Sequence, residues 1–334
     1  MKKKVFPIGI VIILLILLAG GISLFQSVSV KDTYLYIDED DTIDSVYTKL
    51  NHSVNGLQFS AFKSLSSLTK YKKRIRTGRY RLSDKNILQI FRCLRNGNQD
   101  PIRLTIPSVR TMDKLAGVLS EKLMIDSLSL IKAFEDSAFC AHWGYNPRTI
   151  ACMFIPNTYE LYWNISLNDL FKRMKAESAT FWTKDRLHLA KMANFTPEEV
   201  ITLASIVDEE TANNSEKSNI AGMYINRLHI GMPLQADPTI KYAWKRFELR
   251  RIYHDLLLIK SPYNTYINKG LPPGPIRIPT IAGIDAVLNY AHHDYLYMCA
   301  KEDFSGTHNF ARTYAEHLKN AAKYAKALNT HGIK

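Results

Sequence analysis

The sequence predicts an α+β protein in which a small mixed module precedes a larger, mostly helical domain with a small β-sheet. Three observations support this prediction. An unbroken apolar run from Val5 to about Phe25 has the length of a membrane-crossing helix. Short alternating segments then lie among capped helical segments up to residue 107. Helical periodicity dominates from Thr111 onward. We therefore divide the chain into 1–26, 27–107 and 108–334.

The first segment predicts an uncleaved membrane anchor. Lys2, Lys3 and Lys4 precede the apolar run, which contains no charged residue. The positive-inside rule keeps these lysines in the cytoplasm and puts the rest of the chain outside it. We therefore expect a single-pass protein of the cell (inner) membrane, in contact with the bilayer through this helix and with its large domain periplasmic or otherwise extracytoplasmic. A cleaved signal peptide is the alternative, although 20–25 is a poor cleavage site.

The second segment is expected to be a module of strands and helices, in the order strand 34–37, helix 43–50, helix 57–67, strand 77–82, helix 85–95 and strand 103–106. Thr42 can cap the first helix, and Gly97 marks the end of the third. In the second strand, Arg79 and Arg81 should lie on one face and Tyr80 and Leu82 on the other.

The third segment is expected to form helices 111–123, 127–136, 166–182, 197–213, 215–230 and 312–328, with one strand at 295–300. Thr196-Pro197-Glu198-Glu199 is a strong helix start, with a threonine cap and a proline at the first helical position. Loops rich in Pro, Gly, Asn and Tyr follow residue 231, and loops of this kind often carry binding sites.

Charge and composition narrow the classes of partner. The 334 residues carry a net charge of +13, which favours an acidic partner. Nucleic acid is not expected, because the chain lies outside the cytoplasm and has no zinc finger or RNP-like motif. The four cysteines have no CxxC spacing, and the histidines lack close ligand spacing. We therefore expect no metal and no cofactor, and favour an acidic extracytoplasmic polymer.

The sharpest candidate residue is Glu210. The helix before it is apolar or small from Ile201 to Val207, and three acids, Asp208, Glu209 and Glu210, follow. At 100° per residue, Glu210 falls on the stripe of Leu203, Ile206 and Val207, whereas its two acidic neighbours are rotated away. A carboxyl group on a buried stripe keeps its proton near neutral pH, as a general acid must. A solvated helix end is the alternative interpretation.

A glycosidase of the usual type needs a second carboxylate. Asp237 and Glu160 are candidates, although Asp-Pro is also a common turn and sequence spacing places neither residue near Glu210. The segments 157–159 and 263–266 supply tyrosine rings with amide or hydroxyl groups, which suit a sugar, although tyrosines also cap cores.

Taken together, the motifs resemble the YceG-like family of membrane-anchored endolytic murein transglycosylases (MltG). The motifs follow one another in the family's order and are Gly78-Arg79-Tyr80, Pro156-Asn157-Thr158-Tyr159, Ala204-Ser205-Ile206-Val207-x-x-Glu210-Thr211, Asn226-Arg227-Leu228-x-x-Gly231-Met232-x-Leu234-Gln235-x-Asp237-Pro238-Thr239, Tyr263-Asn264-Thr265-Tyr266, Gly270–Ile276 and His308-Asn309-Phe310.

The resemblance implies a LysM-like βααβ module and a catalytic domain that cleaves the β-1,4 bond between MurNAc and GlcNAc within peptidoglycan strands. The product would carry a 1,6-anhydro-MurNAc end. The enzyme would thus be a lyase that cuts nascent strands near the cell-wall synthases and sets their length. Glu210 would be the catalytic acid. Supporting or substrate-binding residues are expected at Asp208, Asn157, Thr158, Tyr159, Glu160, Asn226, Arg227, Gln235, Asp237, Thr239, Tyr263, Asn264, Thr265 and Tyr266.

Two departures from the family pattern stand out. Asp208 occupies a position where the family often has Glu, and Asn157 replaces the usual Asp of a Pro-Asp-Thr motif. Two alternative functions remain open at this point. One is a non-catalytic, membrane-anchored peptidoglycan-binding or division scaffold. The other is a hydrolytic muramidase that uses Asp237 or Glu160 as its second carboxylate.

Overall fold

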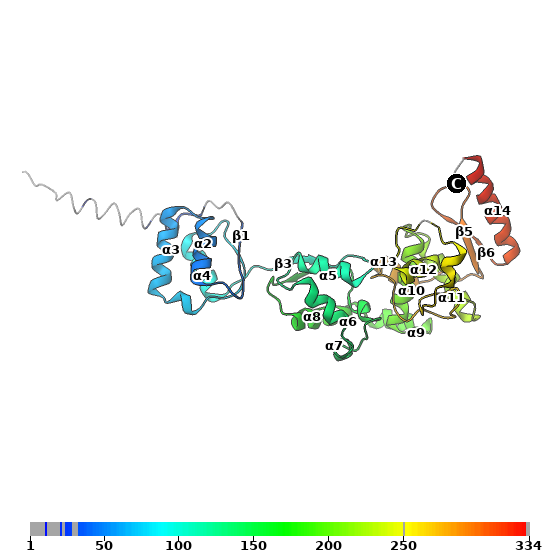
Figure 1. Ribbon diagram of the computed structural model, residues 1–334, viewed down its shortest axis with the longest axis horizontal. Coiled ribbons are helices and arrows are strands. Elements are labelled where there is room, and N and C mark those ends of the chain that lie inside the picture. The colour runs from blue at the N-terminus through cyan, green and yellow to red at the C-terminus, as the bar shows by residue number, and fades with distance from the viewer. Residues whose placement is uncertain (1–10, 12–20, 22–23, 29–32, 250, 332–334) are drawn as a thin grey trace, which may run out of the picture. The chain divides into compact units, whose positions relative to one another are not determined.

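A computed structural model describes residues 11, 21, 24–28, 33–249 and 251–331 (Figure 1). The chain forms two compact units. Unit 1 comprises Met1–Leu104, Ser120–Ile125 and Tyr159–Ser166, and unit 2 comprises Thr105–Leu119, Asp126–Thr158 and Leu167–Lys334. Most of the expected membrane anchor, 1–26, lies outside the described residues. Among the residues that are described, no helix is long and apolar enough to cross a membrane.

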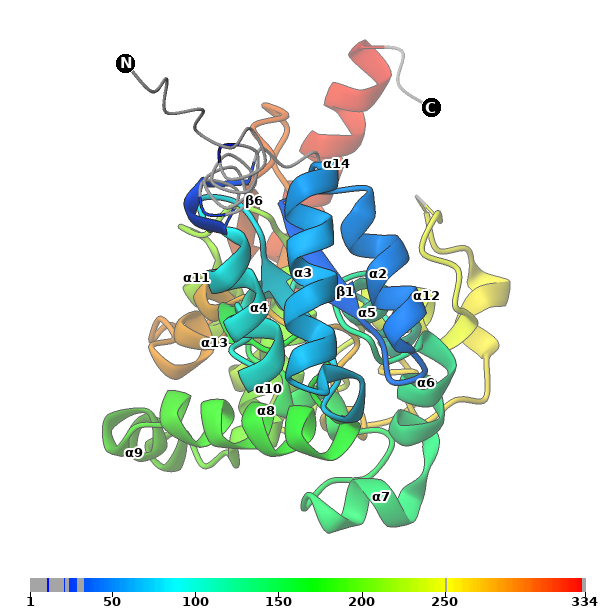
Figure 2. The same cartoon turned by 90° about the vertical axis from the view of Figure 1, so that its left-hand side faces the viewer.

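Unit 1 has the β-α-α-β order expected from the sequence. Its elements are β1 (Tyr34–Ile37), α2 (Ile43–Asn51), α3 (Gly56–Leu68), the 3₁₀ helix η1 (Tyr71–Lys73), β2 (Gly78–Arg81) and α4 (Ile87–Asn96). β1 and β2 pair antiparallel, with Leu35 opposite Tyr80. α2 and α3 lie side by side (Figure 2). Whether this unit is a LysM-like module stays a prediction.

Capping and alternation explain why these segments fold as they do. Thr42, Asn55 and Asn86 each close a capping box at a helix start, which satisfies backbone N–H groups that have no intrahelical partner. Tyr80 and Leu82, which the alternation places on one face, are both fully buried. Arg79 is also buried, because its guanidinium lies 3.5 Å from the centre of the Tyr34 ring.

Unit 2 and the segments near its boundary are mostly helical. The helices are α5 (Met112–Ser120), α6 (Ser127–Glu135), α7 (Ser137–His142), α8 (Leu167–Phe181), α9 (Lys184–Met192), α10 (Pro197–Glu210), α11 (Lys217–His229), α12 (Asp237–Trp244), α13 (Ile281–Leu288) and α14 (Tyr314–Thr330), with 3₁₀ helices η2 (Ile150–Met153) and η3 (His254–Leu258). β3 (Ile102–Thr105) pairs with β4 (Thr158–Leu161), and β5 (Tyr297–Ala300) pairs antiparallel with β6 (His308–Ala311). The mixed α+β class with small sheets is therefore confirmed.

Helix α10 runs through the core of unit 2. Every residue from Val200 to Asp208 is buried, and the helix packs against α11, α12 and α13. Thr196 closes a capping box with Glu199, and Pro197 opens the helix, as predicted. Several predicted boundaries were wrong. α10 ends at Glu210 rather than 213, because Thr211 is extended, and α11 begins at Lys217 rather than 215. α5 ends at Ser120 rather than 123, and β5 begins at Tyr297 rather than 295.

Candidate active site

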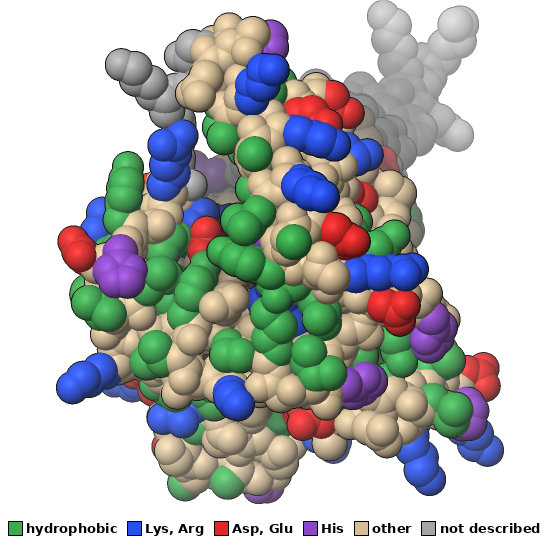
Figure 3. Space-filling model, turned by 90° about the vertical axis from the view of Figure 1, so that its right-hand side faces the viewer, with side chains coloured by type: hydrophobic (Ala, Val, Ile, Leu, Met, Phe, Trp, Pro, Cys, Tyr) green, Lys and Arg blue, Asp and Glu red, His purple; other side chains and the backbone are tan. Residues whose placement is uncertain are grey.

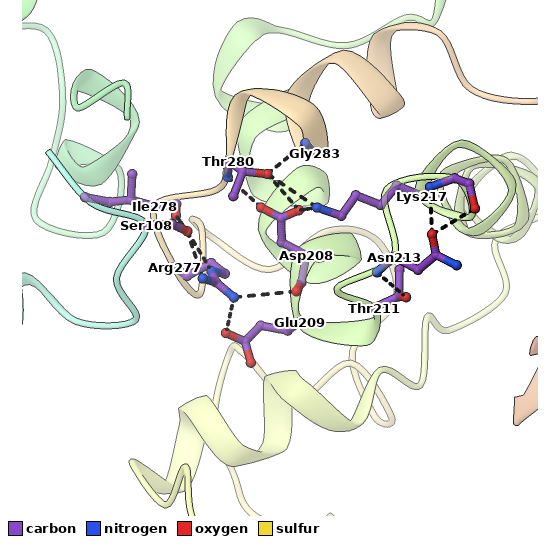
Figure 4. A network of polar contacts seen from close by, with 11 residues as sticks. Ser108, Asp208, Glu209, Thr211, Asn213, Lys217, Arg277, Ile278, Thr280 and Gly283 are labelled. Carbon is purple, nitrogen blue, oxygen red and sulfur yellow. Dashed lines mark hydrogen bonds and ion pairs between the residues drawn. The ribbon is translucent and has the colours of Figure 1, made fainter. Parts of the chain in front are cut away.

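The three acidic side chains in the last turn of α10, Asp208, Glu209 and Glu210, have different surroundings. Asp208 is buried and forms an ion pair with Lys217, whose Nζ lies 2.7 Å from Oδ1 (Figure 4). The backbone N–H of Thr280 donates to the other oxygen of Asp208 over 2.5 Å. Asp208 therefore ties the end of α10 to the starts of α11 and α13. It does not line the cavity described below.

Glu209 is held by two arginines. Arg110 Nε and Arg277 NH1 lie 2.8 Å and 2.9 Å from the same carboxylate oxygen. Ser108 accepts two further hydrogen bonds from Arg277, so the segment before α5 and the loop before α13 meet at this helix end (Figure 4). Two of the three negative charges are thus matched by cations.

Glu210 is the acid that remains, and it faces a cavity of about 340 Å³. The lining residues come from six segments of unit 2 and are Glu210, Met223, Tyr224, Arg227, Leu234, Gln235, Asp237, Tyr266, Tyr297, Met298, Tyr314 and His317. The apolar stripe on α10 that predicted an inward direction for Glu210 explains this position. A cavity of this size with a few convergent polar groups is the usual form of a ligand site.

The surroundings of Glu210 hold its proton. Burial raises the pKa of this carboxyl group from 4.5 to about 7, and the nearby charge of Asp237 acts in the same direction. Tyr224 opposes them, because its hydroxyl donates to Glu210 Oε1 over 2.6 Å and so stabilises the carboxylate. A carboxyl group with a pKa near the working pH can both give and take back a proton.

Asp237 is the other acid of the cavity. It is the first residue of α12 and is exposed, and its Oδ1 accepts a hydrogen bond from the hydroxyl of Tyr266 over 2.5 Å. Burial raises the pKa of Tyr266, so this hydroxyl stays a donor. Glu210 and Asp237 therefore line the same cavity, an arrangement that the alternative of a hydrolytic muramidase with two carboxylates requires.

Arg227 has a supporting role at the base of the cavity. Its guanidinium donates to the backbone oxygens of Leu296 and Leu234, over 2.6 Å and 2.8 Å. Burial lowers its pKa, and the carbonyl partners compensate for part of the lost hydration. Arg227 thus links α11 to β5 and to the loop before α12.

Several other expected site residues form the frame around the cavity instead of lining it. Asn264 is fully buried and donates to the backbone oxygens of Leu257 and Ile259, while Thr265 is hydrogen bonded to Thr239 over 2.8 Å. Asn226 donates to the backbone oxygens of residues 293 and 295, and Tyr263 packs against Tyr242. These contacts fix the loops that carry Gln235, Asp237 and Tyr266.

The motif at 156–160 straddles the boundary between the two units. Asn157 and Thr158 are exposed, and Thr158 Oγ1 lies 2.8 Å from Thr105 Oγ1. Tyr159 is buried and Glu160 is exposed, and both belong to unit 1. None of the four lines the Glu210 cavity. Their contribution to a site stays a prediction.

The sequence did not predict Tyr224, the hydrogen-bond partner of Glu210. It also did not predict the side of the cavity that Tyr297, Tyr314 and His317 form. Tyr224 lies three residues before Arg227 on α11, so helical spacing could have placed it on the same face. No comparable signal exists for Tyr297, Tyr314 and His317, which reach the cavity only through tertiary packing. In the part of the chain that the structure describes, no group of three or more His, Cys, Asp or Glu side chains could hold a metal ion.

Comparison with known proteins identifies the family, because residues 35–323 match the YceG-like family. The chain belongs to the YceG-like family. An endolytic murein transglycosylase of Bacillus subtilis is 37% identical over 164 residues, which are 49% of this chain and 44% of that protein. One from Streptococcus pneumoniae is 25% identical over 97% of this chain and 66% of its own length. The chain thus spans less than two thirds of these relatives.

A solved structure supports the same assignment. The crystal structure of a yceG-like protein from Listeria monocytogenes is similar, with a TM-score of 0.56 and 26% identity. The similarity covers 87% of this chain and 99% of the Listeria chain. It therefore extends over both units.

Proposed function

We propose that this YceG-like chain is a lytic transglycosylase that cleaves the MurNAc-β-1,4-GlcNAc bond within peptidoglycan strands and leaves 1,6-anhydro-MurNAc ends. The observation that carries the proposal is Glu210, a desolvated acid with a pKa of about 7 in a cavity at the end of a rigid helix. The family and the names of its relatives supply the substrate class.

The proposed reaction uses Glu210 twice. Its proton passes to the glycosidic oxygen while the bond to C1 of MurNAc breaks and positive charge develops at C1. The C6 hydroxyl of the same sugar then attacks C1, and the Glu210 carboxylate removes the hydroxyl proton. Because this nucleophile belongs to the substrate, its effective concentration is high and no activated water is required.

Tyr224 and the paired acids prepare Glu210 for this exchange. The Tyr224 hydroxyl stays bound to Oε1 and stabilises the carboxylate that forms after proton transfer. Asp208 and Glu209 are engaged by Lys217, Arg110 and Arg277, and neither lines the cavity.

The same proposal includes the place where the enzyme works. The apolar run at 5–25 would anchor the chain in the cell membrane, with unit 1 as a LysM-like glycan-binding module and unit 2 as the catalytic domain, both extracytoplasmic. The enzyme would then meet nascent strands near the synthases and set strand length. Membrane fractionation of the full chain, followed by protease treatment from the outer side, tests this part; a chain that stays in the soluble fraction overturns it.

The test of the chemistry compares product ends. The full chain, Glu210→Gln and Glu199→Gln are each incubated with uncrosslinked glycan strands, and the ends are identified by mass spectrometry. Glu199→Gln is the matched control, because glutamine preserves the capping box at the other end of α10. Anhydro ends from the full chain and the control, absent with Glu210→Gln, support the proposal.

Two other outcomes would decide for an alternative. Products one water heavier would indicate a muramidase with Asp237 as second carboxylate, the candidate that the cavity brings beside Glu210. Strand binding without cleavage would indicate a peptidoglycan-binding scaffold.

A further inference from the structure

One wall of the Glu210 cavity has no role in the proposed chemistry. β5 contributes Tyr297 and Met298 to it, and α14 contributes Tyr314 and His317. The end of unit 2 that carries α14 shows hydrophobic side chains, tyrosines included, gathered over the middle of its face (Figure 3). In the sequence, β5 and α14 both follow the segments that supply Asp237 and Tyr266.

The rings of this wall lie against one another. Tyr297 and His317 are stacked, with centroids 5.5 Å apart and planes 26° apart. Tyr314 completes the group at 5.8 Å from Tyr297 and 6.0 Å from His317, and 59% of its surface is exposed. Together they form a continuous aromatic surface at a cavity that also contains polar groups. Flat rings of this kind can pack against the apolar C–H face of a pyranose. Ligand pockets are typically lined by aromatic side chains with a few polar groups that orient the ligand.

His317 adds an unused polar atom. Its Nδ1 is shielded from solvent and has no hydrogen-bond partner among the described residues. A buried polar atom without a partner costs free energy, so a turn of the imidazole that brings this nitrogen to a polar group of a bound ligand would recover that cost. Burial and the charge of Arg227 lower the pKa of His317, so the imidazole is neutral near pH 7. A neutral imidazole has one N–H donor and one acceptor.

The neighbouring cation, Arg227, packs against this surface and also lines the cavity. Its guanidinium lies 5.4 Å from the centre of the Tyr297 ring, with Nε and NH1 donating to the backbone oxygens of Leu296 and Leu234. Helix α14 itself contains no buried residue and packs against β5 and β6. Two of its side chains, Tyr314 and His317, line the Glu210 cavity.

We propose that Tyr297, Tyr314 and His317 form a sugar subsite that binds an N-acetylated pyranose unit of the glycan next to Glu210. The rings cover the C–H face of the sugar, and the imidazole of His317 turns its free nitrogen toward the cavity to pair with a hydroxyl or acetamido group. This inference deepens the proposed function and rests on it for the identity of the polymer.

Binding to a full chain that cannot cleave tests the subsite separately from the chemistry. Glu210→Gln serves as the background, and the probes are a soluble N-acetylglucosamine tetramer and uncrosslinked glycan strands, titrated by calorimetry. We expect His317→Ala to weaken binding about tenfold, the effect of losing one hydrogen bond and one ring face. Tyr314→Ala should weaken binding similarly, and His317→Gln should restore part of the affinity.

Tyr324→Ala is the matched control. Tyr324 lies on the same helix but packs against Phe304, and it does not line the cavity. Unchanged affinity in this control supports a direct role for the subsite. Equal losses in the control and in His317→Ala would show that α14 only supports the fold, and unchanged affinity in His317→Ala and Tyr314→Ala would also overturn the inference.

The proposed lyase activity is tested separately, by identifying the ends of the cleaved strands. In the chain with intact Glu210, anhydro ends report the lyase, whatever the subsite variants do. If the lyase is active, His317→Ala should raise KM more than it lowers kcat, since the subsite binds a part of the glycan that does not react. Cleavage without any effect of His317→Ala on KM or on affinity would sink the subsite and leave the lyase intact.

Discussion

Replacing Glu210 by glutamine should make the folded chain more stable above neutral pH and leave its stability unchanged at pH 4. Burial raises the pKa of this carboxyl group from 4.5 to about 7. At about 1.36 kcal/mol per unit of pKa, the difference corresponds to about 3 kcal/mol of unfolding free energy. This is the cost of keeping a charged carboxylate in the cavity, and an uncharged amide of the same shape does not incur it.

The sign of the effect follows from the two protonation equilibria. Below pH 4.5 the carboxyl group is neutral in both the folded and the unfolded chain, so the substitution removes no charge. Between pH 4.5 and 7 the unfolded chain loses its proton while the folded chain keeps it, and the folded chain therefore becomes less stable as the pH rises. Above pH 7 the loss is complete.

Urea unfolding of the parent chain, Glu210→Gln and Glu199→Gln at several pH values between 4 and 9 measures this difference. The advantage of Glu210→Gln should be absent at pH 4, grow through pH 6 and level off above pH 7. Glu199 sits in an exposed capping box at the other end of α10, so its replacement should show no such growth with pH. An advantage of Glu210→Gln that is the same at all pH values would refute the argument that burial holds the proton.

Three further predictions concern the groups around Glu210. Tyr224→Phe removes the hydrogen bond that lowers the pKa of Glu210, so the loss of activity on the alkaline side should move up by about one pH unit in a pH–rate profile. Asp237→Asn removes a charge that raises this pKa, so the same limb should move to lower pH with substantial activity retained; a loss of about a thousandfold would instead indicate a second catalytic carboxylate. Asp208→Asn should cost about 3–5 kcal/mol of unfolding free energy, because it leaves Lys217 charged and buried, and a double variant that also carries Lys217→Met should recover much of this loss in urea unfolding.

Local signals in the sequence predicted the parts of the fold that local interactions decide. Thr42, Asn86 and Thr196 bond to backbone N–H groups three residues ahead, so the start of each helix is encoded within one turn. Asp237-Pro238 shows the limit of this reasoning. The pair also suits a turn, yet it begins α12 because Pro238 and Ile240 are buried in the core.

The candidate site likewise contains some residues that local sequence spacing predicts and others that only tertiary packing places. The direction of Glu210 follows from its spacing to Leu203 and Ile206 on one helix, so it could be predicted. The role of Asp208 could not, because its partners Lys217 and Thr280 are brought to it by the packing of α11 and α13. His317 illustrates the extreme case, since it is 107 positions after Glu210 in the sequence, and only the fold places both at one cavity.

The position of Glu210 at the end of α10 also explains why three successive acids can serve one proton transfer. The C-terminal end of a helix carries partial negative charge, which disfavours a carboxylate there and favours the protonated acid. Three unpaired carboxylates at this end would oppose one another and destabilise the helix. Asp208 pairs with Lys217, and Glu209 pairs with Arg110 and Arg277. These ion pairs offset the negative charges of Asp208 and Glu209, whereas Glu210 has no such cation partner among the ion pairs of the described residues. Glu210 is left with the helix end, a desolvated cavity and a single tyrosine donor, and these are the conditions under which a carboxyl group keeps its proton until a substrate oxygen takes it.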